Sequence, residues 1–295
     1  MLQKIYHVHA LSALHVGTGQ SVGVVDLPIA RARATQLPLV PGSALKGVLR
    51  DELAGTDYKL GTTTHKTLFG PESSADSNTH AGALSVGDAH LLVLPIRALH
   101  GIVAFATSPF ILQRYARDLG LPSSLPTLVV TENETEATLP KGSELNLNNK
   151  VLLEDLDLKV VAAPEADTWA ERIAASLYPA EAEREWRDAF KEHFVILPDA
   201  VFSFLADTAT EIRARVCINN DTRTVAPGAL WYEENLPAES VLWGVLGISR
   251  SRNSEHVANA ETLAQQLPSA LELQIGGKHT IGRGLCRWLL SEPKN

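Results

Sequence analysis

The chain has 295 residues, with 26 Lys and Arg against 34 Asp and Glu, which gives a formal net charge of −8. Its 45% hydrophobic and 20% charged residues are typical of one large folded domain or two ordinary ones, and they exclude a disordered chain or a highly basic nucleic-acid-binding tail. Two cysteines, Cys217 and Cys286, exclude a disulfide framework and a four-thiolate zinc site. No apolar run resembles a signal peptide or approaches the roughly 20 residues of a membrane-spanning helix, so we expect a cytoplasmic protein with no membrane contact.

The negative charge is concentrated in one segment. Residues 132–192 hold 15 acidic and seven basic residues, whereas the rest of the chain holds 19 of each. Outside this segment the basic residues recur in short clusters, among them Arg31/Arg33, Lys46/Arg50 and Arg213/Arg215. Such clusters can line a phosphate-binding groove, although composition alone favours ordinary surface charge. We expect the acidic segment to face solvent or a protein neighbour.

The first half of the chain alternates predicted strands and helices. Apolar and polar residues alternate over 3–13, which predicts a strand with His7 and His9 on one face. The glycines of 15–23 end it, and 24–40 is predicted as loop or hairpin. The remaining predictions are a helix from an N-cap at Ser43 to a stop at Gly55, a long mobile loop at 56–80, strands at 82–94 and 101–107, and a helix from Pro109 to Gly120.

The second half continues in the same way. We predict strands at 127–131, 151–162, 213–218, 240–248 and 271–275, helices at 167–193 (interrupted by Pro179), after Pro198 and at 257–266, an excursion at 219–237 and a last apolar segment, LCRWLL, after the loop 276–284. Because strands outnumber helices and do not alternate with them regularly, the pattern indicates an α+β fold and not a doubly wound parallel sheet.

Neither glycine-rich loop matches a nucleotide-binding fingerprint. Gly17, Gly19 and Gly23 are spaced one residue too widely for the dinucleotide pattern, and 276–284 (GGKHTIGRG) lacks the spacing of a P-loop. The open backbone N–H groups of this second loop, together with Lys278, His279 and Arg283, can wrap a phosphodiester chain. A simple hairpin turn is an equally good interpretation.

Four further positions carry candidate chemistry. The pair His7 and His9 is of the kind that metal hydrolases use, but the other histidines show no repeated strand-end pattern, so ordinary strand-face histidines are favoured. His15, between strand and glycine loop, is placed to reach a polyanion. Asp26 lies between apolar residues and can bind a divalent cation or position an attacking hydroxyl, although a turn aspartate is the simpler reading.

The helix that begins near Ser43 is a further candidate. Its N-terminus, with Lys46 and Arg50 one and two turns along, suits a nucleic-acid phosphate. An ordinary capped amphipathic helix explains the same residues.

Taken together, these segments resemble the repeated backbone subunit of the Cmr, or type III-B, CRISPR effector, a family within the RAMP superfamily. The resemblance rests on LHVGTG (14–19), DLPIARA (26–32), LPLVPGSALKGVLRDEL (37–53), LFG (68–70), GALSVGDAHLLVLPIRALHG (82–101), SPFILQRYARD (108–118), PGALWYEENLP (227–237) and GGKHTIGRG (276–284). It implies a single RAMP-type domain over 1–295 with a modified ferredoxin-like, RRM-type core. The loop at 56–80, an acidic insertion at about 127–195 and a thumb-like β-hairpin at about 219–237 would be its additions.

The resemblance also implies a function. Such subunits stack with copies of themselves and with other Cmr subunits along a CRISPR guide RNA, and the thumb of each interrupts the duplex between guide and single-stranded target RNA. In this family the subunit is a metal-dependent endoribonuclease, so the implied cofactor is a divalent ion, magnesium or manganese. The family therefore serves antiviral defence.

Individual residues are matched to the family as follows. Asp26 aligns with the catalytic aspartate and metal ligand, and His15 with a second active-site residue. Tyr232, Glu233 and Glu234 fall near thumb positions implicated in cleavage, with the choice between the two glutamates open. The implied RNA-binding residues are Ser43, Lys46 and Arg50 on the helix and Gly276, Gly277, Lys278, His279 and Arg283 in the glycine loop.

Two other functions remain open from the sequence. One is a non-catalytic RNA-binding scaffold of the same superfamily, which would be indifferent to substitution of Asp26. The other, weaker one is an unrelated metal hydrolase that uses His7 and His9.

Overall fold

The computed structural model describes residues 1–21, 25–54, 60–71, 79–122, 124–126, 128, 135–219 and 221–291. Its strands are β1 (Leu2–Ala10), β2 (Leu39–Val40), β3 (Leu84–Val86), β4 (Ala89–Arg97), β5 (Val103–Thr107), β6 (Glu136–Leu139), β7 (Lys150–Leu153), β8 (Leu156–Ala162), β9 (Phe194–Ile196), β10 (Glu211–Ile218), β11 (Val225–Asn235), β12 (Val241–Ile248), β13 (Ala270–Gln274) and β14 (Leu285–Ser291). Its helices are α1 (Gly42–Ala54), α2 (Thr62–Phe69), α3 (Pro109–Asp118), α4 (Pro164–Leu177), α5 (Arg184–Glu192), α6 (Asp199–Thr208) and α7 (Ala260–Ala264), with short 3₁₀ helices η1 (Glu181–Glu183) and η2 (His279–Ile281).

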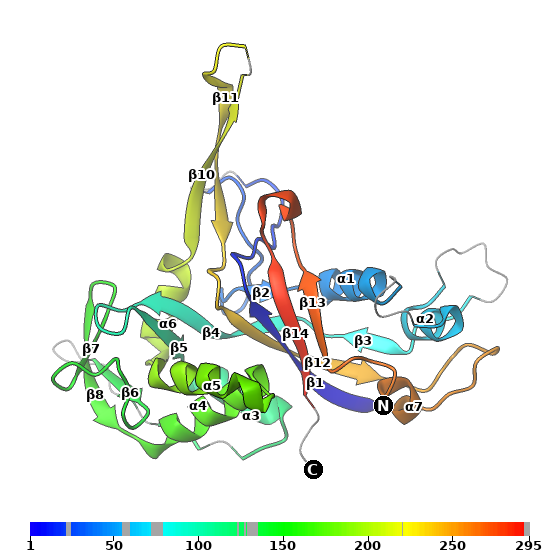
Figure 1. Ribbon diagram of the computed structural model, residues 1–295, viewed down its shortest axis with the longest axis horizontal. Helices are drawn as coiled ribbons and strands as arrows, with labels where there is room; N and C mark the ends of the chain where they lie inside the picture. Colours follow the sequence, from blue (N-terminus) through cyan, green and yellow to red (C-terminus); the bar gives the residue numbers. More distant parts are fainter. Residues whose placement is uncertain are drawn as a thin grey trace.

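A large mixed sheet organises these elements (Figure 1). Its strands run in the order β13-β14-β1-β12-β4-β5-β9-β6-β8-β7, with β2 paired to β4 and β3 to β12. The pairs along β13-β14-β1-β12-β4-β5 are antiparallel, whereas β5 with β9 and β6 with β8 are parallel. This mixture confirms the α+β class.

Strand β1 lies inside the sheet between β12 and β14, and its two faces serve two layers. Tyr6 stacks on Trp288 with ring centroids 4.1 Å apart on one face, whereas the fully buried His7 bonds the Tyr115 hydroxyl at 2.7 Å on the other. His9, also buried, bonds Glu239. The prediction that the two histidines share a face of this strand is therefore right, and both side chains are held in the interior.

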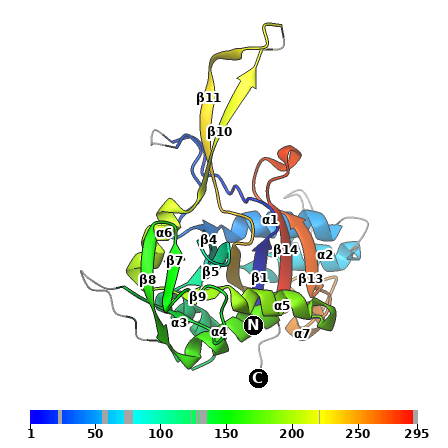
Figure 2. The same ribbon diagram turned by 60° about the vertical axis from the view of Figure 1, so that its left-hand side comes forward.

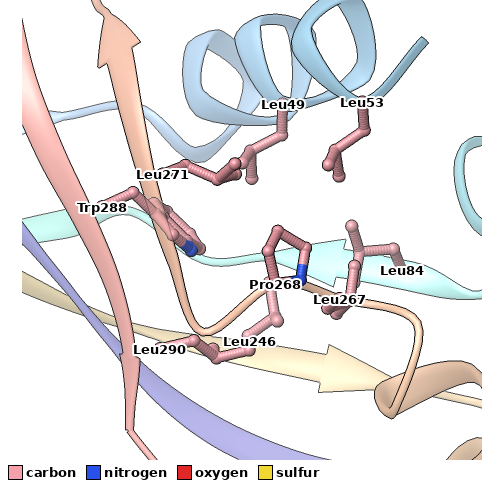
Figure 3. A pocket seen from close by; sticks show the side chains of 9 residues that line it. All are labelled: Leu49, Leu53, Leu84, Leu246, Leu267, Pro268, Leu271, Trp288 and Leu290. Carbon is pink, nitrogen blue, oxygen red and sulfur yellow. The ribbon is translucent and has the colours of Figure 1, made fainter. Parts of the chain in front are cut away.

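Helix α1 covers the Tyr6 face. Its residues Leu45, Leu49 and Leu53 recur at intervals of four and are buried, as an amphipathic helix requires. Figure 3 shows Leu49 pointing from α1 toward Leu271 of β13, while Leu53 points toward Pro268 and Leu84 of β3. The space left among these side chains is about 10 Å³, no more than one water molecule occupies, so the packing is close.

Helices α3 and α4 pack on the opposite face. Tyr115 of α3 lies edge-on to Trp243 of β12 and also approaches Trp169 of α4, and all three rings are buried. Among the described residues, no helix combines the length and the apolar content needed to cross a bilayer.

The acidic segment folds around the far end of the sheet. The interruption predicted at Pro179 is confirmed, because α4 ends at Leu177 and α5 begins at Arg184. The single strand predicted at 151–162 is wrong: β7 and β8 form a hairpin that turns at Glu154, whose φ is +47°. The strand predicted at 127–131 falls almost wholly outside the described residues.

Part of the predicted loop at 56–80 is helical. Thr and His residues form helices weakly on their own, but α2 buries His65, Thr67, Leu68 and Phe69. The His65 ring bonds the backbone oxygen of Arg50 in α1 at 2.8 Å, so a long-range contact overrides the weak local preference. Residues 56–59 and 72–78 of this predicted loop, and the predicted helix stop at Gly55, lie outside the described residues.

The hairpin of β10 and β11 forms a sheet of its own and projects from the molecule (Figure 1). It begins at Glu211, earlier than the predicted 219, because β10 already pairs with β11 from Glu211, opposite Asn235, to Val216, opposite Leu230, and pairs again at Ile218 after an irregularity in register. Alternation gives the hairpin two faces. One carries arginines and Trp231, and the other carries exposed aliphatic residues, namely Ile212, Val216 and Leu230.

The buried His7 makes stability depend on pH. Burial lowers the pKa of His7 to about 4 from an ordinary value of 6.5. Between these two pH values His7 is protonated in the unfolded chain but neutral in the folded one. Its contribution to stability is full above pH 6.5 and is lost as the pH falls toward 4. We expect the free energy of unfolding to fall by about 2 kcal/mol more in the wild type than in His7→Gln between pH 7 and pH 5. Urea unfolding measures this, with the exposed His100→Gln as control; equal slopes for all three proteins would contradict it.

Candidate functional site at the base of the hairpin

Three segments far apart in the sequence meet at the base of the β10–β11 hairpin (Figure 2). Residues 14–21 and 25–31 reach this hairpin through the bridges of Leu27 to Glu233 in β11 and of Leu14 to Leu236, the residue after β11. The glycine loop 276–284 joins them where the Gly277 N–H donates to the His15 oxygen at 2.9 Å. The sequence motifs singled out for chemistry thus converge, except those on α1 and the buried pair His7 and His9.

Asp26 is tied to the hairpin itself. Its Oδ2 accepts a hydrogen bond of 2.7 Å from the backbone N–H of Tyr232. The next residue, Leu27, makes two backbone hydrogen bonds to the same strand: its N–H donates to the Tyr232 oxygen, and its oxygen accepts from the Glu234 N–H. The half-buried carboxylate has no cationic partner among the described residues. Asp26 therefore keeps a fixed position and a charge available for chemistry.

His15 is buried beside it and has a defined orientation. Its Nδ1 lies 2.7 Å from the backbone oxygen of Glu234, and a carbonyl can only accept, so Nδ1 carries the proton and Nε2 of the neutral ring does not. A Cβ on Gly17 would lie 2.7 Å from Nε2. Glycine at this position thus leaves room for the nitrogen that is free to act.

Glu234 has a structural role. Its Oε1 accepts from Arg31 at 2.6 Å and from the Thr210 hydroxyl at 3.1 Å, and its Oε2 accepts from the Ile29 N–H at 3.0 Å. Arg31 also donates to the Ala206 oxygen at the end of α6. This carboxylate is committed to joining the Asp26 segment, β11 and α6.

Glu233 is fully buried among cations. Its Oε1 accepts from Trp231 Nε1 at 3.0 Å and lies 3.3 Å from Lys278 Nζ and 3.6 Å from Arg215 Nε. Burial opposes ionisation, but hydrogen bonds from Trp231 and Lys278 and the nearby charges outweigh it and hold the pKa of Glu233 below its usual value. A carboxylate that stays ionised at neutral pH is poorly suited to act as a general acid. Tyr232, which immediately precedes Glu233, has a side chain 42% exposed.

The three basic residues of the glycine loop differ in their exposure and in their contacts. Lys278 has a left-handed backbone (φ +66°) and lies 5.9 Å from the Trp231 ring centre. Arg283 is buried and its Nε has no partner among the described residues. His279 begins η2, and its backbone oxygen accepts from the Gln274 side chain.

The predicted RNA-binding residues of α1 lie apart from this site. The helix begins at Gly42, so Ser43 is exposed in its first turn and is not the N-cap. Asp88 Oδ1 already accepts the Gly42 N–H at 2.8 Å, which places a carboxylate at the helix N-terminus.

The two basic side chains of α1 turn to backbone oxygens. Lys46 Nζ donates to Leu84 and Arg50 donates to Gly70. Burial and the neighbouring charge of Arg50 lower the pKa of Lys46.

A divalent ion has few ligands available here. Among the described residues no three His, Cys, Asp or Glu side chains are grouped as metal ligands. Asp26 supplies one carboxylate, while Glu233 and Glu234 are neutralised by Lys278, Arg215 and Arg31. These residues do not fit a metal site made by this chain alone.

Sequence reasoning missed the residues that hold the site together. Arg31, Arg215 and Trp231 were visible only as members of a basic cluster or of a matched segment. Their partners lie 203, 18 and 2 positions away, and only the Trp231–Glu233 spacing of alternate strand residues is a local signal.

Two glycines of the same loop give a matched test of its contact with His15. Both Gly276 and Gly282 have positive φ, so alanine at either costs about 1 kcal/mol. A Cβ on Gly276 would lie 2.3 Å from the His15 oxygen, whereas one on Gly282 has nothing within 4 Å. We expect Gly276→Ala to lower the free energy of unfolding about 1–3 kcal/mol more than Gly282→Ala in urea unfolding. Equal losses would mean that the loop does not need this close approach.

Comparison with known proteins identifies the family. A model described as the RAMP superfamily matches residues 7–287. The CRISPR system Cmr endoribonuclease Cmr4 of Pyrococcus furiosus is 34% identical over 98% of this chain and 95% of its own length. A crystal structure of oligomeric Cmr4 from Pyrococcus furiosus matches with a TM-score of 0.73 and 28% identity over 99% of each chain.

A cryo-EM structure of type III-B Cmr-beta bound to cognate target RNA has a similar fold, with a TM-score of 0.72 at 20% identity over 98% of this chain and 97% of the matched chain. These whole-chain similarities confirm the RAMP fold and its ferredoxin-like core. They agree with the resemblance read from the motifs. The chain belongs to the RAMP superfamily and is a homologue of Cmr4.

Proposed function

We propose that this chain is a backbone subunit of a type III-B CRISPR effector, which binds a guide RNA and cleaves complementary target RNA at regular intervals. Its partners would be the guide, the single-stranded target, further copies of itself and other Cmr subunits. The name of the Pyrococcus relative and the target RNA in the Cmr-beta structure support this proposal. The observation that carries it is the fixing of Asp26 and His15 on the base of a projecting hairpin.

The hairpin supplies a reason for regular spacing. Strand β11 has 11 residues and, at about 3.3 Å per residue, is about 35 Å long. A projection of this length is able to separate neighbouring bases of a guide–target duplex. Each subunit would interrupt the duplex once, and each interruption would lie beside one Asp26.

The chemistry follows from an interrupted strand. A nucleotide that is turned out of the duplex can align its 2′-oxygen with the adjacent phosphorus, so that this oxygen forms a new bond while the 5′-oxygen leaves. The 2′-hydroxyl loses its proton and the departing 5′-oxygen gains one. Asp26 is placed to orient the 2′-hydroxyl, and the free Nε2 of His15 to contact the phosphate or exchange a proton.

The divalent ion remains part of the proposal as an expectation. Its ligands beyond Asp26 would come from outside the described residues of this chain. The alternative use of His7 and His9 as metal ligands does not fit, because both are buried and bonded to Tyr115 and Glu239.

Asp26→Asn tests the catalytic role without removing the hydrogen bond. The Asn oxygen can still accept the Tyr232 N–H, so we expect the assembled complex to bind target RNA normally but to cut it at least 10²-fold more slowly. Gel analysis of labelled target RNA measures both. The control is Asp207→Asn, an exposed aspartate that contacts the same segment through Arg31. Unchanged cutting by Asp26→Asn would favour the non-catalytic scaffold.

The roles of the two ring nitrogens of His15 can be tested separately. The amide N–H of His15→Asn can replace Nδ1 in the bond to the Glu234 oxygen but supplies nothing at the Nε2 position. We therefore expect wild-type thermal stability with about 10²-fold slower cleavage. If His15→Asn cleaves at the wild-type rate, the ring serves only to join the strands.

A further inference from the structure

The buried Glu233 carboxylate is surrounded by more positive charge than it can neutralise. It contacts Lys278 of the glycine loop and Arg215 of β10, so one negative charge faces two positive ones. Its Oε2 is buried without a partner among the described residues. The cluster therefore keeps a net positive charge although its carboxylate has no exposure to solvent.

Both cations retain unused hydrogen-bond donors. Lysine has three donors and arginine five, and among the described residues each contacts Glu233 Oε1 through one nitrogen. The Lys278 and Arg215 side chains are 34% and 35% exposed, so these donors are open to solvent. Because both nitrogens lie within 3.6 Å of the same oxygen, they are close enough to contact one phosphate group.

The cluster lies on one face of the hairpin. Register pairs Arg213 with Glu233 and Arg215 with Trp231, so these four side chains share a face. The Tyr232 and Glu234 side chains, whose backbones hold Asp26 and His15, project from the other face. Glu233, which gathers the cation pair, thus lies between the two β11 residues whose backbones hold Asp26 and His15, but its side chain is on the opposite face from theirs.

We propose that Glu233 is a positioning residue, which holds Lys278 and Arg215 together as a binding site for one phosphate of the bound RNA. This inference rests on the proposed function, since it takes RNA as the ligand. Glu233 itself, fully buried, does not touch the RNA. It sets the separation of two cations that come from different parts of the chain.

The two cations are tested first, by titrating the purified full-length chain with labelled single-stranded RNA at several salt concentrations. Lys278→Gln and Arg215→Gln should each weaken binding several-fold and lower the slope of log affinity against log salt by about 1, because each removes one phosphate contact. If both variants keep the wild-type slope, the phosphate site does not exist.

Glu233→Gln tests the positioning role. The Gln oxygen can still accept from Trp231, so the hairpin should stay folded, but the charge that holds the cations is gone. We expect weaker RNA binding and a lower salt slope, even though the substitution makes the protein more positive. In combination with Lys278→Gln it should lower the slope less than the two single changes predict together. Glu211→Gln, which removes a carboxylate paired with Arg213 on the same hairpin, is the control and should leave the slope unchanged.

Other outcomes would overturn the inference. If Glu233→Gln binds RNA as tightly as the wild type, or more tightly, the carboxylate does not position the cations. If it binds normally and instead changes the pH profile of cleavage in the assembled complex, Glu233 takes part in the chemistry. Failure of the wild-type chain to bind RNA at all would instead overturn the proposed function.

Discussion

The arrangement of the site depends on the buried carboxylate of Glu234. It receives Arg31, Thr210 and a backbone N–H of the Asp26 segment, while its own backbone oxygen receives His15. Four groups from three parts of the chain, at His15, at Ile29 and Arg31, and at Thr210, are thereby fixed to one residue of β11. Because Glu234 is buried, loss of Arg31 would leave an uncompensated charge, which costs about 3–5 kcal/mol. The candidate catalytic groups are therefore positioned by an ion pair whose carboxylate is already engaged on both oxygens.

Adjacent glutamates carry out separate tasks because side chains alternate along a strand. Glu234 faces the Asp26 segment and α6, and Glu233 faces the glycine loop. From the sequence alone, the two neighbouring glutamates are equivalent candidates for a catalytic role. Both glutamates are engaged by cations, whereas Asp26 has no cationic partner among the described residues.

Local sequence patterns predicted much of the secondary structure but not the long-range contacts of the fold. The shared face of His7 and His9, the stripe of leucines on α1 and the break at Pro179 follow from periodicity and from proline geometry. Helix α2 was missed because its threonines favour no helix without the contact to α1. At the site, Asp26 and His15 were found through family motifs, while Arg31 and Arg215 gain meaning only from partners that folding brings close.

The acidic segment gives the molecule electrical polarity. Its described elements, from β6 to α5, lie toward one end, and the hairpin with Arg213, Arg215 and Lys278 projects from the other (Figures 1 and 2). The negative end of the molecule is therefore the acidic segment, whereas the hairpin and the glycine loop (211–235 and 276–284) together hold five basic and four acidic residues and are close to neutral. A polyanion that approaches within a Debye length is repelled more strongly by the acidic end than by the hairpin end, which biases its orientation before any contact forms. The net charge of −8 thus resides at one end and does not by itself exclude a polyanion from the hairpin.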